Sequence, residues 1–161
     1  FIQAAEYPYN LEVARPVHGG REAQIKHFMG MALDALGKNQ EAQEAFLVSS
    51  AYSRGWSELS FYKALSMKKT GALQEAEQIL NGLTSYAKRQ IAQGTSQDFF
   101  TKFGEKQSAA VQTARAYYLL GLGEYGLGRI EHAIGAFNQA IELNPNHFWA
   151  RYYLEKTERF N

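Results

Sequence analysis

Apolar residues near the start of this chain recur every three or four positions, the spacing of one face of an α-helix. Between Arg21 and Leu36 they are Ile25, Phe28, Met29, Ala32, Leu33 and Leu36. Gly37 follows, and glycine supplies the left-handed conformation that commonly ends a helix. The pattern predicts a helix over residues 21–36 and a second helix over about residues 40–52.

The same alternation of helix and glycine turn continues along the chain. It predicts further helices over about residues 57–70, 73–94, 108–127, 130–143 and 146–159. The helix that starts near Leu73 meets no stop signal before Gly94, so we expect it to be long, roughly 30 Å. The segment that follows contains Phe99, Phe100 and Phe103. For this stretch we expect a loop or short helix whose rings pack back onto the array.

A group of small and aromatic residues returns after 34 residues. Gly30, Gly37, Ala42 and Phe46 correspond to Ala64, Gly71, Ala76 and Leu80, and then to Gly121, Gly128, Ala133 and Phe137. The third copy follows the second by 57 residues, which is one period plus an insertion of 23. A period of this length indicates a stacked array, because one unit cannot bury its apolar face alone.

The third copy resembles a tetratricopeptide repeat. The family pattern is met by Tyr117, Leu120, Gly121, Gly128, Ala133, Phe137, Ala140 and Pro145. One position departs, because Glu124 stands where the family has an aromatic residue. Copies one and two match less well, with Lys26 in place of a ring and Ala64 in place of glycine. The resemblance implies an all-α fold, a right-handed α–α superhelix of three helical hairpins plus a C-terminal capping helix.

The resemblance also implies a domain organisation. Residues 1–20 are expected to form an irregular junction, because Pro8, Pro16 and the Gly19-Gly20 pair interrupt any helix. Residues 21–160 are expected to form one helical domain. Its repeats would span about 23–56, 57–107 with the insertion, and 114–147, followed by a capping helix over 146–160.

The N-terminal segment resembles a junction in certain large bacterial proteins. It contains Tyr7-Pro8-Tyr9-Asn10-Leu11 and Arg15-Pro16. In those proteins a β-rich domain of unknown function precedes a tetratricopeptide tail, and that domain is similar to carbohydrate-recognising sandwiches. The resemblance implies that this chain is the C-terminal tail of a longer protein, and it makes glycan handling a second context.

In a tetratricopeptide superhelix the first helix of each hairpin lines the concave face. Carried over by position, this places the candidate binding residues His27, Met31, Phe61, Leu65, Arg115, Tyr118, Leu122, Tyr125, Trp149 and Tyr152 there. The family's Lys and Asn clamp for a terminal carboxylate is absent, since its positions hold His27/Met31, Phe61/Leu65 and Tyr118/Leu122. What remains is an aromatic groove with a few charges, which suits docking of a protein segment.

Composition and spacing argue against several other functions. A net charge of +1 is too balanced to favour nucleic acid or an anionic membrane as partner. The chain has no cysteine, which excludes thiolate metal sites and leaves the compartment open. No two of the four histidines lie three or four residues apart, so a helical metal pair cannot form. The sequence predicts no cofactor, no metal and no enzymatic activity.

The sequence therefore predicts a non-catalytic scaffold for protein–protein or interdomain contact. Its partner would be a separate protein segment, a neighbouring domain of the same polypeptide, or a second copy of the chain in a homo-oligomer. The alternative is an accessory carbohydrate-binding or glycan-processing tail. That alternative requires Tyr118, Tyr125 and Trp149 to present flat faces in an open cleft.

Overall fold

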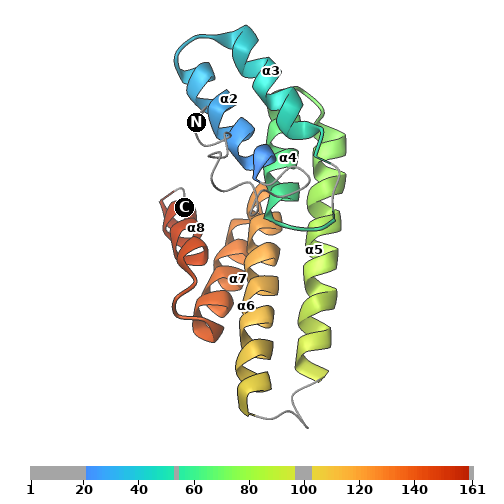
Figure 1. Cartoon of the computed structure of the whole chain (residues 1–161), viewed down its shortest axis with the longest axis vertical. Coiled ribbons are helices and arrows are strands. Elements are labelled where there is room, and N and C mark those ends of the chain that lie inside the picture. Colours follow the sequence, from blue (N-terminus) through green and yellow to red (C-terminus); the bar gives the residue numbers. More distant parts are fainter. Residues whose placement is uncertain (1–20, 53–54, 97–102, 160–161) are drawn as a thin grey trace, which may run out of the picture. The chain divides into compact units, whose positions relative to one another are not determined.

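Seven α-helices account for most of the residues that the structure describes (Figure 1). The computed structural model describes residues 21–52, 55–96 and 103–159. The helices are α2 (Glu22–Ala35), α3 (Asn39–Ser50), α4 (Glu58–Lys69), α5 (Leu73–Ser96), α6 (Phe103–Gly126), α7 (Ile130–Leu143) and α8 (Phe148–Glu158). Over these ranges there is no β-strand, so the fold is all-α, as the sequence predicts.

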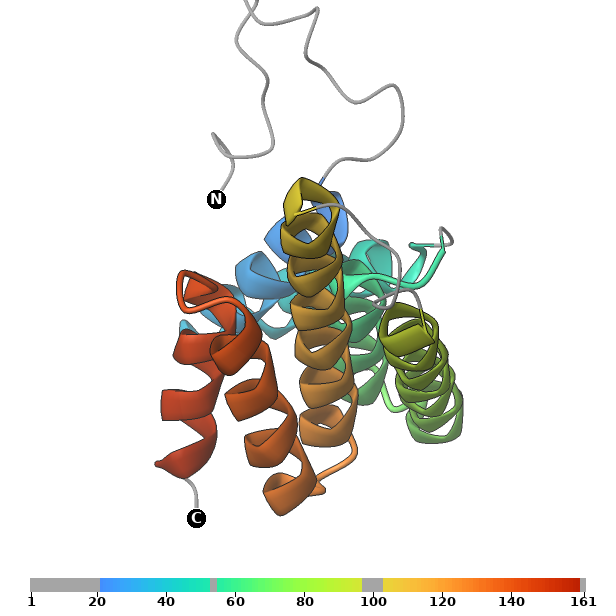
Figure 2. The same cartoon turned by 90° about the horizontal axis from the view of Figure 1, so that it is seen from below.

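The helices belong to two compact units. The first unit comprises Phe1–Gly55 and Leu59–Ile79, and it holds α2, α3, most of α4 and the start of α5. The second comprises Trp56–Glu58 and Leu80–Asn161, and it holds the rest of α5 with α6, α7 and α8. Within the second unit the four helices follow one another in chain order (Figure 2). The repeat boundaries stay a prediction.

Three glycine turns end helices in the same way. Gly37, Gly71 and Gly128 have φ values of +74°, +87° and +76°, a region that glycine enters without steric penalty. The residue after each glycine donates its N–H to a carbonyl five positions earlier, as Lys38 does to Leu33 at 2.9 Å. The predicted turns after α2, α4 and α6 are therefore confirmed.

Two of the hairpins share one packing device, in which a glycine of the first helix receives a phenylalanine ring of the second. A Cβ atom built on Gly30 would lie 2.6 Å from the Phe46 ring, and one on Gly121 would lie 2.4 Å from the Phe137 ring. Both rings are fully buried. The residues that recur in the sequence are thus the ones that let α2 approach α3 and α6 approach α7.

The helices α5 and α6 are each 24 residues long. The long helix predicted from Leu73 is confirmed, and it continues to Ser96. The expected start of the following helix near Ser108 is wrong, because α6 already begins at Phe103. The insertion therefore lengthens both helices. Phe99 and Phe100 lie outside the described residues, as does the predicted junction over residues 1–20.

Close contacts hold α5 against α6 along the second unit. A Cβ atom on Gly123 would lie 2.5 Å from the Thr84 methyl group, and one on Gly126 would lie 2.6 Å from Leu80. Farther along, a Cβ atom on Gly94 would lie 2.5 Å from the Thr113 hydroxyl oxygen. Glycines on α6 thus let two neighbouring helices approach closely. Gly121 faces α7, while Gly123 and Gly126 face α5.

Candidate functional site

The ten candidate residues differ in exposure and divide between the units. His27, Met31, Phe61 and Leu65 belong to the first unit, and Arg115, Tyr118, Leu122, Tyr125, Trp149 and Tyr152 to the second. The side chains of His27, Phe61, Tyr118 and Leu122 are buried. The remaining six are exposed or half-buried, so only these offer surface to a partner.

His27 belongs to a buried chain of hydrogen bonds that links three helices. Ser49 of α3 donates to the Ala23 carbonyl of α2 at 2.7 Å, and Ser66 of α4 donates to the Ser49 hydroxyl at 2.8 Å. Because the one hydroxyl proton of Ser66 is used there, Ser66 accepts from Nδ1 of His27 at 2.9 Å. The sequence alone could not place His27 in this structural role, since its partners lie in other helices.

The candidate residues of the second unit gather around a cluster of aromatic rings. The rings of Tyr118, Phe137 and Tyr153 have centroids 6.0–6.3 Å apart and are buried between α6, α7 and α8. Tyr152 continues the cluster outward, with its ring centroid 5.2 Å from that of Tyr153. Trp149 follows, 5.8 Å from Tyr152. The cluster therefore runs without a break from the core to the surface of α8.

The outer rings meet edge to face. The planes of Trp149 and Tyr152 are inclined by 85°, and those of Phe148 and Trp149 by 79°. Phe148 and Tyr152 are 67% and 40% exposed. This arrangement presents ring edges rather than one flat platform, which suits aliphatic and aromatic side chains.

His147 caps the first turn of α8 and lies beside this cluster. Its Nδ1 accepts a hydrogen bond from the Ala150 N–H at 3.2 Å, so the ring proton of the neutral form sits on Nε2. Its ring centroid is 4.7 Å from that of Tyr118. Burial is the largest effect and lowers the pKa of His147; its own backbone hydrogen bond and then Glu58 oppose this, and the Arg115 charge, the smallest effect, lowers the pKa.

His147 was not among the candidate residues. The available signal was its place directly before the helix that follows Pro145, where a side chain that accepts from a backbone N–H is expected.

Arg115 and Glu58 add charge to the same region. The guanidinium Nη2 of Arg115 lies 3.7 Å from a carboxylate oxygen of Glu58, and 64% of the arginine side chain is exposed. Both charges act on His147. We call this surface the α6–α8 face; it comprises Glu58, Arg115, His147, Trp149 and Tyr152, and it lies over the buried Tyr118 ring.

Tyr125 borders the α6–α8 face. Burial raises the pKa of its phenol, and the nearby Tyr152 adds to the rise. At neutral pH the Tyr125 phenol therefore stays protonated and can donate or accept a hydrogen bond.

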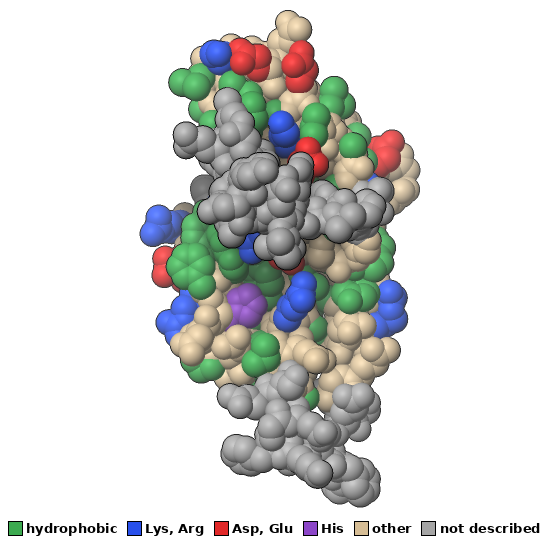
Figure 3. Space-filling view, in the orientation of Figure 1, with side chains coloured by type: hydrophobic (Ala, Val, Ile, Leu, Met, Phe, Trp, Pro, Cys, Tyr) green, Lys and Arg blue, Asp and Glu red, His purple; other side chains and the backbone are tan. Residues whose placement is uncertain are grey.

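Other functional classes find no support among the described residues. Within residues 21–52, 55–96 and 103–159, no cluster of three or more metal-ligating side chains occurs. No described helix is both long enough and apolar enough to cross a membrane. Basic and acidic side chains are interspersed over the face in Figure 3, where a histidine lies beside apolar side chains.

Comparison with known proteins identifies the segment that carries much of the α6–α8 face. Residues 114–147 match the model of the tetratricopeptide repeat. This segment is a tetratricopeptide repeat. It contains most of α6 and all of α7. The prediction that the third hairpin is of this family is confirmed, and the rest of the chain lies outside the match.

Several solved structures are similar to this chain. The first tetratricopeptide domain of the human RPAP3 protein is 19% identical, with a TM-score of 0.35, over 88% of this chain and 93% of that one. MamA (residue 41 to its end) from Desulfovibrio magneticus RS-1 is 18% identical, with a TM-score of 0.29, over 87% of this chain and 85% of that one. No curated protein sequence matches the chain.

Glu124, the residue that departs from the tetratricopeptide pattern, is buried and ion-paired. Arg129 donates to one carboxylate oxygen at 3.1 Å, and the Lys88 ammonium lies 3.6 Å from the other. Lys88 comes from α5, outside the repeat. At the position of the expected ring, the Glu124 carboxylate instead contacts α5 through Lys88.

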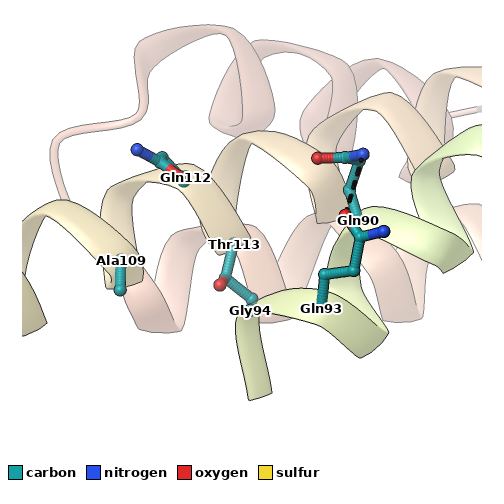
Figure 4. Close-up of a pocket in the computed structure, with 6 residues that line it drawn as sticks. All are labelled: Gln90, Gln93, Gly94, Ala109, Gln112 and Thr113. Atoms are coloured by element: carbon teal, nitrogen blue, oxygen red, sulfur yellow. Dashed lines mark hydrogen bonds between the residues drawn. The ribbon is translucent and has the colours of Figure 1, made fainter. Parts of the chain in front are cut away.

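A small pocket lies between α5 and α6, just before the tetratricopeptide repeat in sequence (Figure 4). Its volume is about 120 Å³, and its lining residues are Gln90, Gln93, Gly94, Ala109, Gln112 and Thr113. Gln90 donates to Gln93 at 3.4 Å. The lining is polar and uncharged, and the pocket holds none of the residues predicted from the sequence.

Proposed function

We propose that this chain is a non-catalytic interaction scaffold whose α6–α8 face docks a protein segment. The observation that carries the proposal is the aromatic cluster that continues from the buried core to the half-buried Trp149 and the exposed Tyr152. Aromatic side chains held rigid by a packed core bind with little loss of conformational entropy. The tetratricopeptide repeat contributes Arg115 and His147 to this face, and repeats of this family are protein-interaction modules.

The burial of Tyr118 determines which substitutions can test the proposal. Replacing that buried ring would disturb the core, so a loss of binding would have two explanations. Trp149 and Tyr152 are the better probes, because both have exposed surface. The edge-to-face rings give no support to a carbohydrate platform, and we do not propose one.

Photo-crosslinking in the organism that makes the protein tests the docking face. A photoreactive phenylalanine at the exposed position of Glu155 would be activated in cells, and crosslinked partners would be identified by mass spectrometry. We expect one dominant crosslinked protein segment, with a yield that falls roughly tenfold in Trp149→Ala or Tyr152→Ala. The masses would tell a separate protein from a second copy of the chain.

A control is Leu36→Ala, which removes an exposed apolar side chain in the first unit. Circular dichroism spectra of all variants would exclude unfolding. Equal crosslinking yields for Trp149→Ala and Leu36→Ala would contradict the proposed docking face.

A further inference from the structure

Hydrogen-bond donors dominate the polar groups of the α6–α8 face. The Arg115 guanidinium has five N–H donors, and it makes a single ion pair, with Glu58, within the described part of the chain. The Nε2–H of His147 donates to no described residue, since the hydrogen bond of this ring is the one to its Nδ1. The Trp149 indole N–H likewise has no acceptor among the described residues.

Charged side chains of both signs flank the face on α8, because the exposed Glu155 lies three residues after Tyr152. Lys156 lies four residues after Tyr152 and seven after Trp149, so it stands on the same side of α8. Its ammonium group lies 5.8 Å from the centre of the Tyr153 ring. The carboxylate of the face itself is that of Glu58. A ligand that complements the N–H donors and the exposed Arg115 guanidinium supplies acceptors and a negative charge at that position.

The ion pair between Arg115 and Glu58 is loose. Its 3.7 Å separation exceeds the 2.7–2.9 Å of a charge-assisted hydrogen bond, and the arginine is mostly exposed. Exposed pairs of this kind contribute little to stability. A carboxylate that reaches the guanidinium in the bidentate geometry would therefore displace Glu58.

We infer that the segment docked on the α6–α8 face carries a carboxylate that binds Arg115 in competition with the chain's own Glu58. This inference rests on the proposed function and names the chemistry of the partner. Arg115 pairs with the incoming carboxylate, and the N–H groups of His147 and Trp149 donate to acceptors of the same segment. Glu58 competes with the segment for the Arg115 guanidinium. A segment without a negative charge cannot displace Glu58 and therefore binds more weakly.

Two capped peptides test the inference with the full chain. The acidic probe is acetyl-Glu-Glu-Phe-Glu-Glu-amide, and the neutral probe has glutamine for each glutamate. Proton–nitrogen NMR spectra would follow the Trp149 indole N–H and the Arg115 Nε–H during titration. We expect the acidic peptide to shift both signals and the neutral peptide to bind at least about tenfold more weakly.

Substitutions distinguish the effect of the Glu58 carboxylate from that of the peptide carboxylate at Arg115. Glu58→Gln should tighten binding of the acidic peptide about three- to tenfold, because the competitor is lost. Arg115→Gln should weaken it at least about tenfold. Arg89→Gln makes the same charge change at an exposed position of α5, and it should leave the dissociation constant within about twofold of the original.

Three results would overturn the inference. They are equal binding of the two peptides, unchanged or weaker binding in Glu58→Gln, and no shift with the acidic peptide. If both peptides move the Trp149 signal equally, docking on the face stands and only the carboxylate requirement fails. The crosslinking experiment tests independently of the peptides whether a protein segment docks on the α6–α8 face.

Discussion

His147 holds the first turn of α8 through a nitrogen that accepts a hydrogen bond only while it is unprotonated. Burial lowers its pKa in the folded chain, whereas in the unfolded chain the ring titrates near its ordinary value of about 6.5. As the pH falls through that value, the unfolded chain binds a proton that the folded chain does not. The contribution of His147 to stability is therefore complete above about pH 6.5 and declines below it.

We predict that His147→Asn flattens this decline, because asparagine caps a helix without titrating. Urea unfolding at pH 7.5, 6.5 and 5.5 would give the free energy of unfolding for each variant. His132→Asn, at an exposed position on α7, is the matched control. An equally steep loss of stability in all three proteins would show that another group causes it.

Gly121 tests whether the recurring glycines act through packing. A methyl group there would meet the buried Phe137 ring, so Gly121→Ala should lower the free energy of unfolding by about 1–3 kcal/mol. Gly135→Ala in α7 has open space around the new methyl group and should raise it by about 0.5–1 kcal/mol. Chemical denaturation of both variants measures the contrast, and effects of the same sign would refute the packing role.

At the scale of single residues, the sequence predicted packing better than function. Gly121 and Phe137 could be recognised because they recur at a fixed period. His27 occupies a groove position by count, yet its environment depends on Ser49 and Ser66 from other helices. The role of His147 depends on where α8 begins and on the distant Arg115 and Glu58, and no local pattern reports that.

Helix α6 is anchored to α5 by the buried carboxylate of Glu124, whose side chain is 4% exposed. Arg129 forms the closer contact to it, while the Lys88 side chain is 62% exposed. Arg129→Ala should therefore cost about 1.5–3 kcal/mol, because it removes a hydrogen bond to a buried charge. Lys88→Ala should cost less than about 1 kcal/mol.

Urea denaturation of the two single variants and of Glu124→Gln would rank these contributions. The ranking is the test, since general charge effects would treat both cations alike. A larger loss in Lys88→Ala than in Arg129→Ala would contradict this ranking and make the contact to α5 the stronger of the two.

The bounds of the helices were predictable wherever a glycine ends one of them. Gly37, Gly71 and Gly128 mark turns because their backbone conformation penalises other residues. The early start of α6 at Phe103 was not predictable, because Gly104 suggests a break. One glycine disfavours a helix by only about 1 kcal/mol, and α6 continues through Gly104 as part of a 24-residue helix.

At the scale of the whole molecule, the repeat predicted the fold class but not the partner. The residues that match the tetratricopeptide pattern are those that pack helices together, such as Ala133 and Phe137, both fully buried. The α6–α8 face is built from positions that the pattern leaves variable, such as Arg115 and Trp149. For that reason the candidate residues could be assigned from their positions within the repeat, while the burial of each side chain had to come from the structure.

The two compact units predict how the chain responds to local destabilisation. In repeat arrays, stability is approximately a sum of the stability of each unit and of its contacts with its neighbours. Gly30→Ala and Gly121→Ala introduce the same clash, one in each unit. Native-state hydrogen exchange should therefore show faster exchange mainly in α2 and α3 for the first variant and mainly in α6 and α7 for the second. Because α5 runs through both units as one continuous helix, its amides should respond partly to each variant. If either variant accelerated exchange equally in all seven described helices, the chain would unfold as a single cooperative body, and the continuous α5 would be the element that couples its two units.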